Sequence, residues 1–316
     1  MPIFNFFGQY WFGTNQQDQY VGTDYGNLAH GMNGNDRLWM GGGNDKAYGG
    51  EGNDMLNGGA GDDLLVAGAG NDYAYGGTGV DVIHGGLGND TMVGGDGDDF
   101  LNGGEGNDML FGDAGNDEIV GGQGMDTVNY AMSSSGVGVN LAIGKGFGGD
   151  AEGDTYDSIE GVIGSNHDDI LFGSASHDRL DGAGGNDILA GGAGSDHIRG
   201  GANGDGPFGD LLSGGQHGDI FMFALGDSGA GSGMDIVTDF VKGEDWIMIE
   251  GDFATVTGQQ GGFVTNGAEL YFQQTFVQGV GEATTVHYRD EAGASSDLDI
   301  LLMGHQDLDA SDFFFV

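Results

Sequence analysis

The chain has 316 residues, of which 72 are Gly, and its formal net charge is -43 because 50 acidic residues face only seven Lys and Arg residues. This balance argues against nucleic acid as a partner, since binding to phosphates depends on basic side chains. A compact fold with so many like charges requires bound cations. The chain has no Cys, so we expect any metal to be held by oxygen ligands.

The first 12 residues, MPIFNFFGQYWF, are rich in aromatic side chains and are predicted to form an N-terminal cap. They contain neither the basic region nor the small-residue cleavage site of a secretory signal peptide. No apolar run in the sequence approaches the ~20 residues that a transmembrane helix needs. We therefore predict no transmembrane segment.

A nine-residue repeat occupies residues 13–129. Aligned on an Asp at the sixth place, residues 49–57 read GGEGNDMLN and residues 103–111 read GGEGNDMLF, so the unit is Gly-Gly-x-Gly-x-Asp-x-U-x, with U an apolar residue. The first two of the 13 nonamers are degenerate and carry Asp18 and Asn27 at the sixth place. Strict repetition at a short period indicates a solenoid.

The spacing within the nonamer has a mechanical interpretation. Glycines at the first, second and fourth places permit positive φ and close backbone approach, so six residues can turn sharply. The triplet x-U-x then forms a short strand whose middle side chain points to one side. If each nonamer is half a coil, residues 18 apart stack at about 4.8 Å, which places Asp36 over Asp54. Ca²⁺, which takes about six to eight oxygen ligands, relieves the repulsion between stacked carboxylates, and Mg²⁺ fits less well because it resists dehydration.

After Asn129 the nine-residue phase breaks, and residues 130–163 are predicted to form a connector. A second array over 164–222 begins with GSNHDDILF and GSASHDRLD, and a five-residue insertion separates Asp196 from Asp210 before Asp219 restores the period. His167, Ser176 and Phe208 replace the glycine at the fourth place. We therefore expect less regular calcium occupancy in this array.

With these motifs, the chain resembles the RTX family, the hemolysin-type calcium-binding repeat proteins. The resemblance implies an all-β fold, in which a parallel β-roll, a right-handed calcium-binding solenoid, forms two blocks and is followed by a C-terminal β-rich cap. It also implies multiple Ca²⁺ ions, bound by loop carbonyls and by the sixth-place aspartates. The predicted metal ligands are Asp36, Asp45, Asp54, Asp63, Asp72, Asp81, Asp90, Asp99, Asp108, Asp117, Asp126, Asp169, Asp178, Asp187 and Asp196.

From residue 223 to residue 316, glycine-rich loops give way to alternating apolar segments such as MDIVTDF and LDILLM, which predict antiparallel strands. The stretch GDSGAGSGMDIVTDFVKGEDWIMI resembles the cap that follows the β-roll in serralysin-type secreted proteins, and the terminal SDFFFV resembles a type I secretion signal. The resemblance implies export from a Gram-negative bacterium, so that the protein is extracellular or on the cell surface.

The sequence predicts no catalytic residues. None of its eight His residues begins a His-Glu-x-x-His motif, which would place two metal ligands on one helix. Gly226-Asp227-Ser228-Gly229 matches part of a serine-protease motif but lacks an identifiable His and Asp partner. We therefore predict that the chain is not an enzyme.

The outer places of the strands, seven and nine, are more informative. A solvated face would carry polar residues at these places, whereas here many are apolar, which predicts that something covers them. The cover could be another part of this chain, a second copy or other partner, or an extracellular polysaccharide stacked on the aromatic rings. We predict calcium-dependent self-assembly into a homo-oligomer or ordered array through Trp39, Tyr48, Met55, Tyr73, Tyr75, Phe100, Met109 and Phe111.

Two functions fit these expectations. The first is a secreted, non-enzymatic structural or interaction protein of a surface layer, extracellular matrix or adhesive assembly. The alternative is a polysaccharide-binding or accessory module of a secreted enzyme of the epimerase, lyase or protease type. Because the repeat begins at residue 13, this alternative requires the catalytic domain to be a separate chain.

Overall fold

The computed structural model describes residues 10–204, 208–224, 227, 233–250, 257–259, 262–265, 268–277, 281–289, 298–304 and 306–315. They form two compact units: the first comprises residues 10–133 and 144–162, and the second comprises residues 134–143 and those from 163 onward. Most of the predicted N-terminal cap lies outside the described residues. No helix within the described part of the chain is long and apolar enough to cross a membrane.

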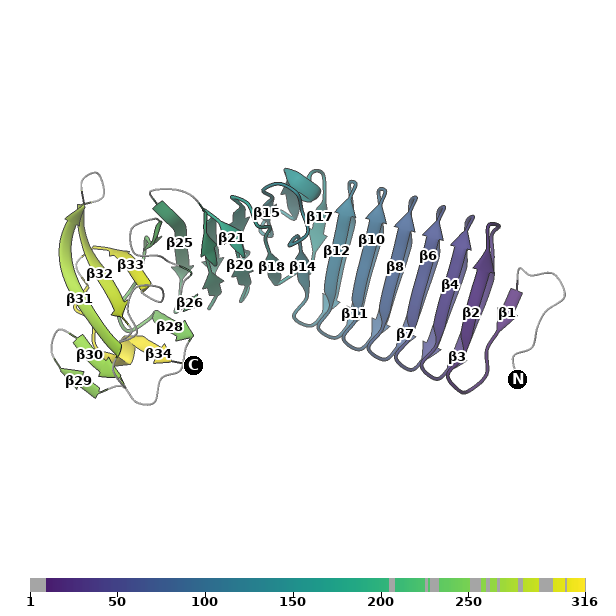
Figure 1. Ribbon diagram of the computed structural model, residues 1–316, viewed down its shortest axis with the longest axis horizontal. Helices are drawn as coiled ribbons and strands as arrows, with labels where there is room; N and C mark the ends of the chain where they lie inside the picture. Colours follow the sequence, from purple (N-terminus) through teal and green to yellow (C-terminus); the bar gives the residue numbers. More distant parts are fainter. Residues whose placement is uncertain are drawn as a thin grey trace. The chain divides into compact units, whose positions relative to one another are not determined.

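The first unit is a parallel β-roll in which successive strands alternate between two sheets (Figure 1). One sheet contains β2 (Gln19–Thr23), β4 (Arg37–Gly42), β6 (Met55–Ala60), β8 (Tyr73–Thr78), β10 (Thr91–Asp96), β12 (Met109–Ala114) and β14 (Thr127–Asn129). The other contains β1 (Tyr10–Phe12), β3 (Leu28–Asn33), β5 (Lys46–Glu51), β7 (Leu64–Ala69), β9 (Val82–Leu87), β11 (Phe100–Glu105), β13 (Glu118–Gln123) and β17 (Thr155–Asp157).

The register confirms the predicted coil of 18 residues. Leu38 pairs with Leu56, Leu56 with Ala74 and Ala74 with Met92 along one sheet. The eighth-place side chains from Ala29 to Val128 form the expected single row of apolar core residues, and each of them is at most 1% exposed. The strict period of nine therefore fixes both the pairing and the core.

The strands of the first unit are longer than the predicted triplet. Most run for six residues, from the seventh place of one nonamer through the third place of the next, and leave a three-residue turn. The residue at the first place is therefore also inside, as Met40 and Ala67 show by being fully buried. Because this place is usually Gly, it carries no apolar signal in the sequence.

The second unit repeats the parallel pattern with less regular strands. One parallel series is β15 (Gly138–Asn140), β19 (Ile170–Phe172), β22 (Ile188–Ala193), β25 (Phe208–Gln216), β27 (Met234–Val237) and β33 (Leu298–Met303). The other is β20 (Arg179–Asp181), β23 (His197–Arg199), β26 (Ile220–Ala224), β28 (Trp246–Glu250) and β34 (Phe313–Phe315). A short pair, β21 (Gly184–Gly185) and β24 (Ala202–Asn203), accommodates the insertion.

The predicted boundaries of the connector and cap differ from those in the structure. The connector is divided between the units: β15 pairs with β19, whereas β17 pairs with β13 and is joined by β16 (Lys145–Phe147) and the 3₁₀ helix η1 (Gly149–Ala151). β18 (Gly161–Ile163) ends the segment.

In the predicted cap, β27, β28 and β34 remain parallel, and the 3₁₀ helix η2 (Ala310–Asp312) precedes β34. The antiparallel strands are β29 (Thr257–Gln259), β30 (Gly262–Thr265), β31 (Ala268–Val277) and β32 (Gly281–Arg289), with β33 beside them.

Candidate metal centre

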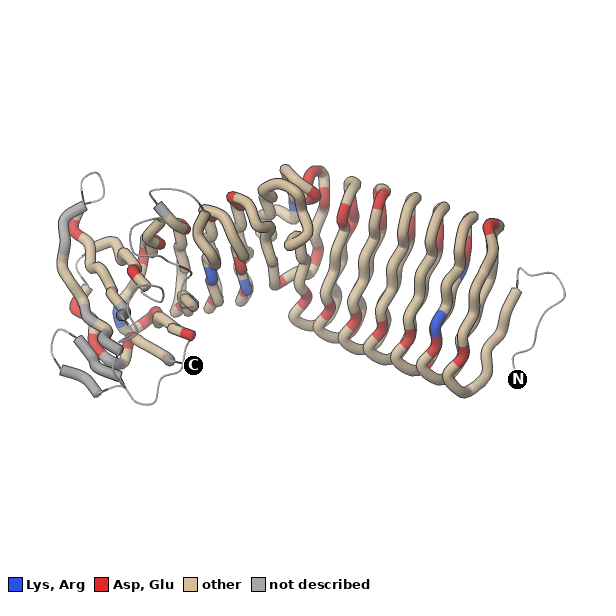
Figure 2. The backbone as a smooth tube through the Cα atoms, viewed as in Figure 1, with Lys and Arg blue, Asp and Glu red and all other residues tan. Residues whose placement is uncertain are grey.

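The sixth-place aspartates lie in two regular rows, one along each turn edge of the first unit, where acidic residues recur at every coil (Figure 2). Each carboxylate is joined to the coil before it. The backbone N–H of Asp36 donates to Asp54 Oδ1 at 2.7 Å, and that of Asp45 donates to Asp63 Oδ1 at 2.8 Å. The backbone N–H of each later sixth-place Asp donates in the same way to Oδ1 of the Asp 18 residues further on, up to Asp126. One oxygen of each aspartate is thus used to lock the register.

The second oxygen of these aspartates is buried without a hydrogen-bond partner. An unsatisfied buried polar atom costs about 1–3 kcal/mol, and more when it is charged, so a regular series of them calls for a bound cation. The Oδ2 atoms concerned are those of Asp36, Asp45, Asp54, Asp63, Asp72, Asp81, Asp90, Asp99, Asp108, Asp117 and Asp126 in the first unit, and Asp187, Asp196, Asp210 and Asp219 in the second.

The first-place glycine lets this oxygen and a backbone carbonyl oxygen both approach its Cα closely. A Cβ atom built on Gly58 would lie 2.2 Å from Asp63 Oδ2 and 2.7 Å from the carbonyl oxygen of Gly76. The described residues contain no group of three or more acidic or His side chains placed to hold a metal. A cation here must therefore take many of its ligands from carbonyl groups, which suits Ca²⁺ and not Zn²⁺.

Burial shifts the titration of the two rows. Burial, together with neighbouring carboxylates in the row, raises the pKa of Asp54 and Asp90 to about 7, and burial raises that of Asp72 to about 6. The backbone N–H groups that bond to Oδ1 act in the opposite direction. A nearby cation would favour the ionised form of these carboxylates and lower their pKa values again.

The structure adds ladder residues that the nine-residue period did not predict. Asp154 Oδ1 accepts the N–H of Asp117 at 2.9 Å, and Glu160 Oε2 accepts that of Asp126 at 3.1 Å. In the second unit the ladder passes through Asp210 and Asp219 to Asp235 and Asp245. Asp154, Asp235 and Asp245 each stand two residues before a buried side chain, Tyr156, Val237 and Ile247. The pattern Asp-x-apolar would have found them where the spacing did not.

Two predicted metal ligands have a different environment. Asp169 and Asp178 take their places in the ladder, because their backbone N–H groups donate to Oδ1 of Asp187 and Asp196. Their Oδ2 atoms, however, accept the backbone N–H groups of Ser165 and Ser174, at 2.6 and 2.5 Å. These two carboxylates are satisfied within their own turns.

A tyrosine closes the end of one row in the first unit. The Tyr130 hydroxyl donates to Asp154 Oδ2 at 2.5 Å and lies 2.6 Å from the Tyr156 hydroxyl. Tyr130 is 2% exposed. In Asp154 a neutral hydroxyl thus satisfies Oδ2, the atom that has no hydrogen-bond partner in the preceding aspartates of the row.

We expect Tyr130→Phe to lower the free energy of unfolding by about 1–3 kcal/mol, because it removes a hydrogen bond from a buried carboxylate. Chemical denaturation at saturating calcium measures this change. Tyr25→Phe is the control, since Tyr25 is 72% exposed. A Tyr130→Phe variant as stable as the control would contradict a closing role for this hydroxyl.

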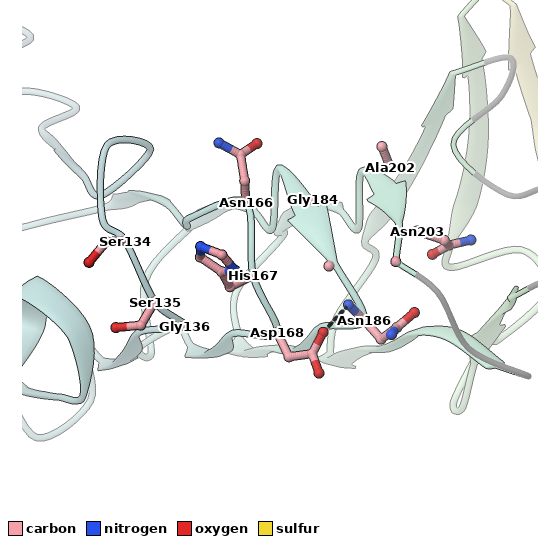
Figure 3. A pocket seen from close by; sticks show the side chains of 12 residues that line it. Ser134, Ser135, Gly136, Asn166, His167, Asp168, Gly184, Asn186, Ala202 and Asn203 are labelled. Atoms are coloured by element: carbon pink, nitrogen blue, oxygen red, sulfur yellow. Dashed lines mark hydrogen bonds between the residues drawn. The ribbon is translucent and has the colours of Figure 1, made fainter.

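The second unit contains a polar groove of about 620 Å³ along its turns (Figure 3). Its lining residues come from two turns, 166–168 and 184–186, which hold the third to fifth places of their nonamers. Ser134, Ser135 and the insertion around Asn203 complete the lining. His167 lies in this groove, in a turn as expected, and the Asn186 N–H donates to Asp168 Oδ1 at 2.9 Å. The groove therefore combines residues of the regular turns with residues of the insertion.

The predicted interaction residues lie on the outer faces of the two sheets. Met55, Tyr73 and Met109 stand in one register row, with Thr91 between Tyr73 and Met109, and the three are 38%, 40% and 36% exposed. The other five, Trp39, Tyr48, Tyr75, Phe100 and Phe111, are half-buried. Met55, Tyr73 and Met109 are therefore the most accessible of the eight predicted interaction residues.

The family model that matches the sequence is the RTX calcium-binding nonapeptide repeat, over residues 12–47, 21–56, 41–74, 57–92, 93–128 and 163–198. The solution structure of the AlgE6R3 subunit from the Azotobacter vinelandii mannuronan C5-epimerase is 29% identical, with a TM-score of 0.37, over 48% of this chain and 80% of that one. The crystal structure of extracellular lipase LipA from Serratia marcescens is 18% identical, with a TM-score of 0.27, over 76% of this chain and 40% of the lipase. The chain thus corresponds to less than half of the lipase. No curated relative matches it.

Proposed function

We propose that this chain, which carries RTX calcium-binding nonapeptide repeats over residues 12–128 and 163–198, is a secreted, non-enzymatic structural protein that folds on calcium and then self-associates. The observation that carries the proposal is the row of buried Oδ2 atoms without partners along each turn edge. Without a cation these carboxylates repel one another, and their Oδ2 atoms have no hydrogen-bond partner. The chain therefore stays unfolded where calcium is scarce. Bound calcium supplies the missing positive charge.

This behaviour suits a protein that is exported and assembles outside the cell. An unfolded, strongly acidic chain can pass through a narrow secretion channel, and calcium outside then provides free energy of folding. We propose an extracellular or cell-surface location in a Gram-negative bacterium, reached by type I secretion through the C-terminal segment SDFFFV. The role is that of a surface layer, matrix or adhesive assembly.

We propose that the surface for self-association is the outer face of β6, β8, β10 and β12, covered by a second copy of the chain. Met55, Tyr73, Thr91 and Met109 stand in register on this face, while the acidic rows lie on the turns. Two such faces can approach without bringing the acidic rows together. Calcium is required, because the net charge of -43 otherwise repels a second copy.

Polysaccharide stacking receives less support from the aromatic side chains. The rings of Phe12, His30 and Tyr48 stack with centroids 5.0 and 4.5 Å apart and with interplanar angles of 3° and 7°. Both faces of the His30 ring are thus covered by its neighbours. A sugar approaching this row would meet ring edges, whereas sugar stacking uses ring faces. We therefore favour a protein partner over a polysaccharide.

Sedimentation velocity tests the proposal. With millimolar calcium we expect the wild-type chain to form large species, and we expect Met55→Gln/Tyr73→Gln/Met109→Gln to weaken association about ten-fold or more, since ~1.4 kcal/mol of lost burial suffices for that. The control is Val80→Gln/Leu87→Gln/Met125→Gln, which removes exposed apolar side chains from two turns and from the end of β9. A wild-type monomer at high concentration in calcium, or equal effects of both triple variants, would contradict self-association through this face.

A further inference from the structure

The backbone at the second place divides the nonamers into two classes. In most of them this residue has a positive φ, as at Gly50 with +119° and Gly192 with +106°. Within the nonamers over 13–129 and 164–199 there are four exceptions, and they are the first two nonamers of each array. All four carry a hydroxyl at this place: Thr14, Thr23, Ser165 and Ser174.

In these four nonamers the ladder residue is held by its own turn. Thr14 donates its N–H and its hydroxyl to Asp18 Oδ2 at 2.5 and 2.7 Å. The hydroxyls of Ser165 and Ser174 donate to Oδ1 of the aspartates four residues later, at 2.8 and 3.2 Å, beside the N–H bonds to Oδ2 described above. The Thr23 hydroxyl reaches Asn27 Oδ1 at 3.4 Å. We call these four nonamers closed turns.

Every nonamer with a positive φ at the second place leaves its Asp Oδ2 without a hydrogen-bond partner. The absence of glycine does not by itself close a turn. Met32, Asp113 and Ala183 hold the second place with φ of 84°, 67° and 67°, and Oδ2 of their aspartates remains without a partner. Nor does a non-glycine fourth place close a turn, because His217, with φ of 78°, precedes Asp219, which is also open.

The same backbone bond recurs at the other end of the second unit. The N–H of Val241 donates to Oδ2 of Asp245, the last rung, at 2.7 Å. Asp154, at the end of a row in the first unit, receives the Tyr130 hydroxyl instead. Closure therefore accompanies the start of each array and the ladder ends at Asp154 and Asp245.

We propose that the closed turns are metal-free starting rungs, in which a Ser or Thr at the second place fixes where the calcium ladder begins. The N–H and hydroxyl donors occupy the carboxylate that would otherwise bind Ca²⁺, so Asp18, Asp169 and Asp178 are structural and are not calcium ligands. Their bonds span four residues and need no cation. A closed turn thus presents an ordered edge on which the first calcium-binding coil stacks. The inference rests on calcium binding by the open rungs and is independent of self-association.

Calcium counting by elemental analysis after equilibrium dialysis tests this assignment. Asp178→Asn is compared with Asp196→Asn, one coil further along the same row, with circular dichroism at saturating calcium to confirm folding. We expect Asp178→Asn to keep the wild-type number of bound ions and Asp196→Asn to lose at least one. Equal losses in the two variants would overturn the proposal.

A second variant tests the same assignment by creating a calcium site. Its result does not depend on whether Asp196→Asn folds. Ser174→Gly/Ser176→Gly gives this nonamer the glycines of an open turn while Asp178 remains in place. We expect it to bind one more ion than the wild type. An unchanged number of ions in this variant would show that the second-place hydroxyl does not set the start of the ladder, and would overturn the proposal.

Discussion

Chelation of calcium at pH 8 is expected to unfold the β-roll, and acidification of the chelated protein to about pH 5 is expected to restore much of its β structure. Both results follow from the buried carboxylate rows. Burial raises the pKa of Asp54, Asp90 and Asp117 to about 7 and that of Asp63 and Asp99 to about 6. An Asp in an unfolded chain titrates near ~3.9.

The sign follows from proton linkage. The metal-free folded chain holds protons that the unfolded chain has already lost, so protonation stabilises the fold fully below about pH 4. This stabilisation is lost as the pH rises through about 6 to 7, where the buried rows ionise. For the same reason protons compete with calcium, and the calcium concentration needed for folding should rise as the pH falls below about 7.

Far-ultraviolet circular dichroism measures both effects, as a pH series with chelator and as calcium titrations at pH 8 and pH 6. The series stops near pH 5 because the chain has a pI of about 4.1, and proteins associate readily at zero net charge. A chelated protein that keeps its whole β signal at pH 8 would contradict calcium-gated folding. A chelated protein that gains no β signal on acidification would contradict the role assigned to the buried carboxylates.

Gly97→Ala is expected to lower the stability of the first unit by about 3 kcal/mol or more. Gly97 holds the fourth place with φ of +147°, and an added Cβ would lie 1.6 Å from the carbonyl oxygen of Gly79. The strain of the backbone is worth about 1–3 kcal/mol, and forced repacking costs a similar amount. The coils are hydrogen-bonded above and below, so the clash cannot relax into solvent.

The thermal midpoint at saturating calcium measures this effect, with an expected decrease of about 6 to 12 °C for a unit of this size. The neighbouring Asp96→Ala serves as the control, since Asp96 stands at the exposed third place of the same turn. We expect that control to change the midpoint little. A Gly97→Ala variant as stable as Asp96→Ala would show that the coils can separate at this turn.

The nine-residue period predicted the features that repeat strictly. The ladder from Asp36 to Asp126, the 18-residue register and the core row from Ala29 to Val128 all follow from one spacing. The period did not predict Asp154 or Asp235, because inserted segments change the separation while the following buried residue stays in place. The buried first place was missed because Gly has no side chain to signal an inward direction.

The closed turns were invisible for a different reason. In the sequence, Thr14 and Ser174 only make their nonamers look degenerate, whereas in the structure they donate to the ladder aspartates. Closure depends on the residue four positions before the aspartate: Ser174 lacks a positive φ and donates to the carboxylate, whereas Ala183 takes a positive φ and leaves it open. The nine-residue period treats both simply as departures from glycine. The structure was needed to separate the two classes of aspartate.

Because successive nonamers alternate between two sheets, it matters whether the roll gains or loses an even or an odd number of nonamers. Each residue is in register with the residue 18 positions later, so duplication or loss of 18 residues in the gene adds or removes a whole coil and leaves every other neighbour relation unchanged. A change of nine residues instead moves each later strand to the opposite sheet and places the row of Tyr73 in line with that of Val82. The strand pairing of the first unit is therefore preserved only when its length changes by an even number of nonamers.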